Sequence, residues 1–113
     1  MQISYKHQAT ERTNGDACVV IKPCIEDETM DFVIVEITGR YPSANQATNL
    51  KCKEIIYVNA GSGKVVIEGK AYLINAGDVI LIEAAEKFYW EGNMNLSISC
   101  RPAWTQEQHV LID

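Results

Sequence analysis

The regular spacing of glycine and Asn/Asp turn signals constrains the fold of this chain more than any other feature. Such signals lie at Gly39, Gly61, Gly63, Gly77-Asp78 and Gly92-Asn93. Eight short β-rich runs lie between turn signals, at residues 17–22, 31–38, 54–60, 64–69, 71–74, 78–83, 87–92 and 96–100. Several of these runs alternate apolar and polar residues, which is typical of strands with one buried face. Many short strands separated by turns predict an all-β sandwich or barrel.

Two segments outside these runs carry different signals. Residues 41–49 are polar and rich in turn-forming residues, so we predict a loop there. The stretch from Thr105 to Gln108 has the spacing of a capping box and predicts one helical turn. We interpret Gly61 and Gly63 as a turn that needs positive φ, because the residues that would make this stretch a phosphate-binding loop are absent.

Length and charge limit the classes of protein to consider. With 113 residues, of which 47% are hydrophobic, we expect a single domain over residues 1–113. A net charge of -5 and a pI near 5.0 argue against a nucleic-acid partner and against an anionic membrane surface. No apolar run approaches the roughly 20 residues of a membrane span, and the N-terminal residues lack the apolar core of a secretory signal. We therefore expect a cytoplasmic protein.

The four cysteines carry no signature of metal binding. Cys18, Cys24, Cys52 and Cys100 form no Cys-x-x-Cys pair. Two or three of them fall in apolar, strand-like runs, where a free cysteine behaves as a small hydrophobic residue. In a reducing compartment we expect them to be structural thiols.

The second half of the chain resembles the conserved barrel of the cupin superfamily. The resemblance lies in the order of three stretches: "EIIYVNAGSG" from Glu54, "IEGK" from Ile67 and "NAGDVILI" from Asn75. It covers about residues 39–104, and the spacing of the glycine turns is its most specific part. The resemblance implies a double-stranded β-helix of the jelly-roll type, which agrees with the all-β prediction made from the strand pattern.

The metal-binding positions of that family are altered in this chain. The first family motif resembles His-x-His-x-x-x-Glu, and stepping back from Glu54 places its two histidines at Thr48 and Leu50. The three marker positions of the second motif fall on Glu83, Ala85 and Phe88. A transition metal in such a site needs several imidazole nitrogens besides a carboxylate. We therefore predict that no metal and no other cofactor is bound.

The chain has two histidines, His7 and His109, one near each end and neither near a motif. For each of them a solvated or hydrogen-bonded side chain is the expected role. A weaker alternative is a metal-dependent oxygenase or isomerase with unusual ligands, such as Cys52 or His7, folded into the pocket.

If the barrel forms, alternate residues of its central strands point inward. The expected ligand-binding residues are Thr48, Leu50, Glu54, Ile56, Phe88 and Trp90. They would form an apolar pocket with an aromatic wall and one carboxyl group, and such cavities are where small molecules bind.

Three roles are open for Glu54. It could be a general acid or base whose pKa is raised by desolvation. It could accept hydrogen bonds from a ligand. Alternatively, it is only held by a cationic or backbone partner, for example Lys51, Lys53 or Arg101, and stabilises one end of the barrel.

The leading functional hypothesis is a metal-independent module that binds or senses a small molecule, such as a sugar-like compound or an organic acid. We expect it to be a homodimer, because the strand edges and outer sheet faces of jelly rolls need cover. The alternative is a metal-free sugar isomerase, epimerase or lyase in which Glu54 is the catalytic acid/base. In that case Tyr57 or Tyr41 would be a proton donor.

Overall fold

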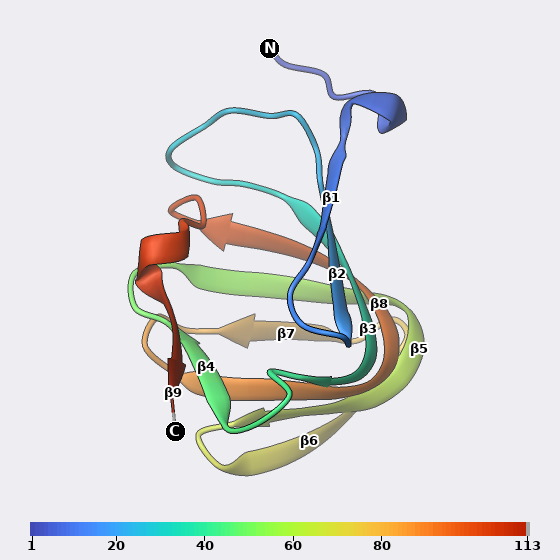
Figure 1. Ribbon diagram of the computed structural model, residues 1–113, viewed down its shortest axis with the longest axis vertical. Coiled ribbons are helices and arrows are strands. Elements are labelled where there is room, and N and C mark those ends of the chain that lie inside the picture. The colour runs from blue at the N-terminus through green and yellow to red at the C-terminus, as the bar shows by residue number, and fades with distance from the viewer. Residues whose placement is uncertain (113) are drawn as a thin grey trace.

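The computed structural model describes residues 1–112, which form nine strands and two short 3-10 helices in a single curled sheet (Figure 1). The strands are β1 (Thr10–Thr13), β2 (Cys18–Lys22), β3 (Val33–Tyr41), β4 (Gln46–Asn49), β5 (Lys53–Ile67), β6 (Lys70–Asn75), β7 (Val79–Ile82), β8 (Lys87–Arg101) and β9 (His109–Ile112). The helices are η1 (Lys6–Gln8) and η2 (Gln106–Gln108). The all-β prediction is therefore confirmed.

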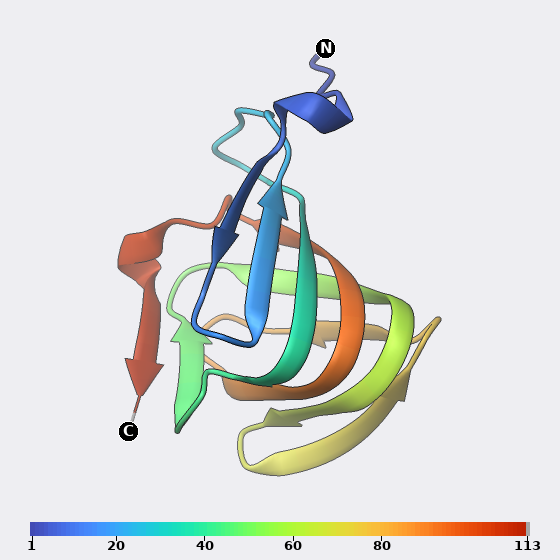
Figure 2. The ribbon, with the colours of Figure 1, turned by 45° about the vertical axis from the view of Figure 1, so that its right-hand side comes forward.

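Two long antiparallel strands, β5 and β8, form the centre of the sheet. Their register runs from Lys53 opposite Arg101 to Ile67 opposite Phe88, with a shift between Val58 and Ala60. Strand β5 also pairs with β6 and β7, and β8 also pairs with β3 and β4. Figure 2 shows β3, β8 and β5 curving side by side around the interior. Each of the two long strands therefore contributes to both halves of the jelly roll.

Glycines allow the paired strands β5 and β8 to bend together. Gly61 (φ +88°) and Gly92 (φ +145°) adopt positive φ, and a Cβ added to Gly92 would lie 2.6 Å from the Cα of Gly63. The interpretation of Gly61 and Gly63 as a turn is wrong, because both lie inside the continuous strand β5. The turn expected at Gly92 is wrong for the same reason, because β8 runs through it. What these glycines provide is the close approach of two backbones.

Three short strands, β1, β4 and β9, were not expected from the sequence. The loop predicted over residues 41–49 contains strand β4, which pairs with β8 and β9. Strands β1 and β9 were not predicted, because both are short and neither has a buried apolar face. The helical turn expected near the C-terminus is confirmed as η2, although Thr105 makes no side-chain cap.

The core fills the inside of the curled sheet. Ile37, Ile56, Ile82 and Leu96 are among its fully buried side chains. Alternation along β5 places Ile56 inside and its neighbour Ile55 outside, as the pleat of a strand requires. Among residues 1–112, no helix has the length and apolar character needed to cross a lipid bilayer.

Replacing Gly92 with alanine tests the close approach of β5 and β8 at the Gly63–Gly92 pair. The new Cβ would meet the backbone of Gly63 and would also disfavour the positive φ. We expect the free energy of unfolding, measured by chemical denaturation, to fall by about 3 kcal/mol. Gly69→Ala is the matched control, because Gly69 has φ +80° but open space around it, and it should cost about 1 kcal/mol. Equal losses of stability in the two variants would contradict the need for a close backbone approach at Gly92.

Candidate functional site

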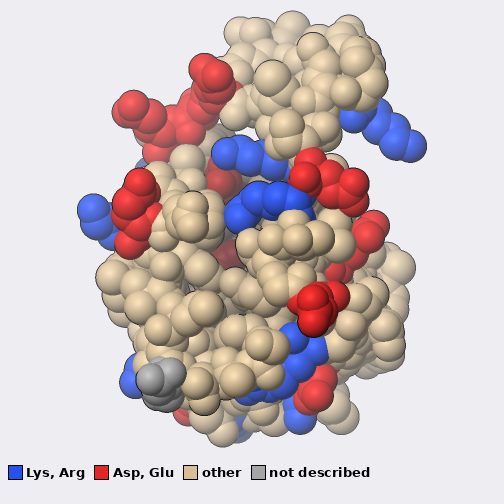
Figure 3. Space-filling model, viewed as in Figure 1, with Lys and Arg blue, Asp and Glu red and all other residues tan. Residues whose placement is uncertain are grey.

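A cavity of about 270 Å³ opens into the curled sheet between the N-terminal hairpin β1–β2 and the C-terminal segment. Its walls come from β1, β2, β3, β5 and β8, together with Trp104, Gln106 and His109. Figure 3 shows this face of the molecule, with basic atoms bordering a hollow and acidic atoms visible inside it. The cavity is mostly apolar, with polar groups at its floor and entrance.

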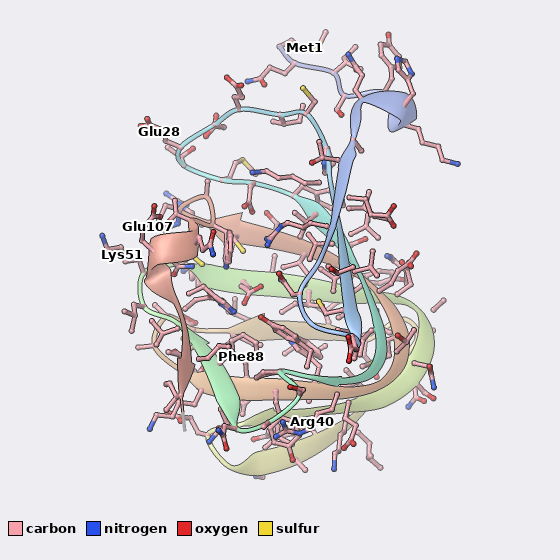
Figure 4. The ribbon with its side chains drawn as sticks, viewed as in Figure 1. Met1, Glu28, Arg40, Lys51, Phe88 and Glu107 are labelled. Atoms are coloured by element: carbon pink, nitrogen blue, oxygen red, sulfur yellow. The ribbon has the colours of Figure 1, made fainter. Side chains whose placement is uncertain are left out.

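Three of the predicted site residues line this cavity: Glu54, Phe88 and Trp90. Phe88 and Trp90 are buried and contact each other edge to face, with ring centroids 6.4 Å apart. Figure 4 labels Phe88 inside the curled sheet, whereas Lys51 and Glu107 lie at its outside. The structure therefore brings together the carboxyl group and the aromatic wall that the sequence predicted.

The other three predicted residues do not line the cavity. Leu50 is 53% exposed, because β4 ends at Asn49 and Leu50 begins the turn toward β5. Thr48 is buried, but its hydroxyl donates a hydrogen bond to the carbonyl of Glu86 at 2.8 Å. Ile56 faces inward but lies deeper, as part of the apolar core. The expectation that these three line the pocket is wrong.

Glu54 lies at the floor of the cavity and is only 8% exposed. The side-chain amide of Asn49 donates a hydrogen bond to its carboxyl group. No lysine or arginine forms an ion pair with it, since Lys64–Glu91 is the ion pair found among residues 1–112. Its partner is therefore an amide rather than Lys51, Lys53 or Arg101. Burial raises the pKa of Glu54 to about 7, and the nearby charge of Asp31 acts in the same direction.

Asp31 is a second carboxyl group in the cavity wall, where the sequence predicted only one. Its two carboxylate oxygens accept hydrogen bonds from the backbone N–H groups of Cys100 at 3.0 Å and Trp104 at 2.9 Å. Asp31 thus ties the loop before β3 to the end of β8. Its hydrogen bonds identify it as a structural carboxylate.

The side chain of Asn49 connects several groups of the site. Its Oδ1 accepts hydrogen bonds from Trp104 Nε1 at 3.1 Å and from Gln108 Nε2 at 3.0 Å. It also lies 2.9 Å from Nδ1 of His109. Because these partners can only be satisfied by an acceptor, the amide oxygen faces them and the amide nitrogen faces Glu54.

This arrangement fixes the tautomer of His109. Its Nδ1 carries the proton, because an amide oxygen can only accept. Burial lowers the pKa of His109, which favours the neutral ring. Its Nε2 is then an acceptor for the hydroxyl of Tyr41, 2.9 Å away. Burial also raises the pKa of Tyr41 to about 12, so its phenol keeps its proton.

His109, Asn49, Asp31 and Trp104 were not predicted as site residues. His109 lies far from every motif in sequence, and only the pairing of β9 with β4 brings it beside Tyr41. Of the two tyrosines considered as proton donors, Tyr41 lines the cavity. Tyr57 is on the outer face and cannot reach it. No local sequence signal distinguished these residues, because their proximity depends on long-range pairing.

The fold commonly implies a metal at this place, so we tested the residues present against that chemistry. Within residues 1–112, no three His, Cys, Asp or Glu side chains are grouped so that they could hold a metal ion. His7 is exposed in η1, and Cys52 is buried outside the cavity wall. The side chain of Asn49 is hydrogen bonded to both Glu54 and His109, and an amide is a poor ligand for a transition metal. The residues of this site therefore do not fit a metal ion.

The model of the AraC-like ligand binding domain matches residues 53–91. Among proteins of curated function, none matches the chain. Pac13, described as a unique nucleoside dehydratase, shares the fold with a TM-score of 0.89 at 15% identity, over 99% of this chain and 91% of that chain. A Streptomyces PAC13 variant solved with uridine gives a TM-score of 0.90 at 15% identity, over 99% of this chain and 90% of that one.

An RmlC-like cupin from Shewanella frigidimarina shares the fold with a TM-score of 0.75 at 15% identity, over 91% of this chain and 92% of that chain. The chain has the cupin fold. Ectoine synthase from P. lautus also shares the fold, with a TM-score of 0.74 at 15% identity, over 100% of this chain and 91% of that chain. The double-stranded β-helix implied by the resemblance is therefore confirmed.

The raised pKa of Glu54 predicts a specific pH dependence of the stability of this protein. The ordinary pKa of a glutamate is 4.5, and that of Glu54 in the folded protein is about 7. Between these two pH values, Glu54 keeps its proton in the folded state but has lost it in the unfolded state. Stability therefore falls as the pH rises through this window, by about 3 kcal/mol in total. The measurement is the free energy of unfolding against pH for wild type and Glu54→Gln. The free energy of unfolding of wild type should fall relative to that of Glu54→Gln as the pH rises from 4.5 to about 7. Parallel curves for the two proteins would contradict a pKa of Glu54 raised by burial.

Proposed function

We propose that this cupin binds a small polar organic molecule in its cavity and moves a proton on it without a metal, as a lyase, isomerase or epimerase. The observation that carries the proposal is the placement of Glu54 at the floor of an apolar cavity, with no cation paired to it. A carboxyl group whose pKa is about 7 is present in both protonation states near neutral pH, so it can both take and return a proton.

Glu54 alone can move the carbon-bound proton in this reaction class. The carboxylate of Glu54 would remove a proton from a carbon next to a carbonyl group of the ligand, leaving the electron pair in an enolate. In an isomerisation, the proton of the hydroxyl group on that carbon passes to the enolate oxygen, and Glu54 returns its own proton to the former carbonyl carbon, so that the carbonyl group moves to the first carbon. In an elimination, the C–O bond to a hydroxyl group breaks instead, and the proton on Glu54 joins the leaving hydroxide to give water.

The other polar groups of the cavity have positioning roles. The hydroxyl of Tyr41 donates to His109, so its lone pairs remain free to accept a hydrogen bond from a ligand hydroxyl. Asn49 holds the carboxyl group of Glu54 in place. Phe88 and Trp90 supply apolar surface against which a sugar or a base ring can pack. The similarity in fold to a nucleoside dehydratase and to ectoine synthase supports this proposal.

Exchange of ligand hydrogens with solvent tests the role of Glu54. Aldoses, nucleosides and small hydroxy acids are screened for a rise in melting temperature, and the ligands that bind are followed by NMR in D2O. We expect deuterium to enter at a carbon next to a carbonyl group. Glu54→Gln should keep the melting shift and lose about 100-fold or more in exchange rate. Glu36→Gln is the control, because Glu36 lies on the exposed face of β3.

A second candidate, a module that binds or senses its ligand without chemistry, is supported by the match to the AraC-like ligand binding domain. In that case a ligand would raise the melting temperature of wild type but not of Phe88→Ala, and no deuterium would enter it. Binding with wild-type exchange in Glu54→Gln would contradict the acid/base role of Glu54. These outcomes separate the two functions.

We also propose that the protein is a homodimer that covers the outer face of β5 and β7. On this face Ile55 pairs with Leu81 and Tyr57 with Val79. All four side chains are 49–60% exposed, which makes a contiguous apolar surface on neighbouring strands.

Light scattering of wild type should give twice the mass of 12.6 kDa. Leu81→Lys should give the monomer mass, and Leu111→Lys, on exposed β9, should not. A monomeric wild type would contradict the proposal.

A further inference from the structure

We propose that Arg12 and Lys22 form a subsite at the cavity entrance that binds an anionic group of the ligand, a carboxylate or a phosphate. Both residues line the cavity and both are exposed. The inferred ligand is therefore a small organic anion whose charged end lies at the entrance. That orientation rests on the proposed function, whereas the anion subsite does not.

The N-terminal hairpin positions the two cations on one face. Arg12 of β1 pairs with Val20 of β2, and Thr10 of β1 pairs with Lys22 of β2. Residues two apart on a strand point the same way, and cross-strand partners share a face. Arg12, Val20 and Lys22 therefore all face the cavity, which agrees with its wall. The hairpin lies outside residues 53–91, so the match to the ligand-binding domain says nothing about it.

Among residues 1–112, neither Arg12 nor Lys22 forms an ion pair. The ion pair present among residues 1–112 is Lys64–Glu91, on another part of the surface. The guanidinium of Arg12 donates to Oδ1 of Asn14 at 3.0 Å and lies 4.9 Å from the ring centroid of Trp104. A planar guanidinium held over an aromatic ring keeps further N–H groups for a ligand.

The charge of Arg12 acts inside the cavity. It opposes the effect of burial on the pKa of Tyr41 and adds to the lowering of the pKa of His109. The whole chain carries a net charge of -5, so an anion is not attracted to the protein in general. Arg12 and Lys22 thus place positive charge at the entrance of the cavity although the protein as a whole is acidic.

The two ends of the cavity suit the two ends of such a ligand. The entrance offers the donors of Arg12 and Lys22, which match the geometry of a carboxylate or a phosphate. The floor offers Glu54, an acceptor that repels an anion when ionised and suits a hydroxyl or carbonyl group when protonated. An anionic group therefore belongs at the entrance, and the reacting part of the ligand belongs beside Glu54.

The test uses NMR titration of the indole N–H signals of Trp90 and Trp104 at constant ionic strength. Inorganic phosphate tests binding of a phosphate group, and D-glucuronate tests binding of a carboxylate. D-glucose is the uncharged analogue of D-glucuronate and serves as its control. We expect at least one of the two anions to give a saturable shift of the Trp104 signal, and glucose to bind more weakly than glucuronate. Arg12→Gln and Lys22→Gln should each weaken binding of that anion about tenfold.

Controls separate this proposal from a general charge effect and from the proposed function. Arg101→Gln and Lys70→Gln remove the same charges from exposed positions outside the cavity, and both should leave the affinity unchanged. Glu54→Gln should bind the anion at least as well as wild type, even if the acid/base role of Glu54 fails. No saturable shift with either anion, or equal losses in the cavity and control variants, would overturn the proposal.

Discussion

The antiparallel ladder between β5 and β8 is the constraint on which the rest of this structure depends. It pairs residues from Lys53 to Ile67 with residues from Arg101 back to Phe88, so both strands must bend to follow the barrel. The bend needs Gly61, Gly63 and Gly92, since any Cβ there meets the facing backbone. The ladder holds Glu54 at one end and the aromatic pair at the other. The site is thus a direct consequence of how these strands curve.

The second constraint is the short connection from Asn49 to Glu54. It joins β4 to β5, and the side chains at its two ends are hydrogen bonded to each other. The oxygen of Asn49 meanwhile binds Trp104, Gln108 and His109, which come from the C-terminal segment. One amide therefore connects the floor of the cavity to the segment that closes its side. Buried polar networks of this kind are favourable only when each member is satisfied.

Sequence alternation was sufficient to predict the all-β fold, because a strand with one buried face leaves a period-two pattern wherever the chain is long enough. The sequence pattern predicted two separate strands for each of β5 and β8, because a glycine inside a bent strand cannot be distinguished by sequence from a glycine in a turn. The carboxyl group and aromatic wall were predicted because Glu54, Phe88 and Trp90 lie on these strands. His109 could not be predicted as a site residue from the sequence, because its position depends on the pairing of β9 with β4.

The separation of charges in the cavity follows from the same architecture. Arg12 and Lys22 belong to the hairpin at the entrance of the cavity. Glu54 is the second residue of β5 and lies at the floor. A cation in contact with Glu54 would favour its ionised form and lower its pKa, which would remove its capacity to donate a proton near neutral pH. Asn49 holds the carboxyl group without adding a charge. Burial therefore raises the pKa of Glu54 to about 7 in a cavity whose wall also includes two cations, because neither cation forms an ion pair with it among residues 1–112.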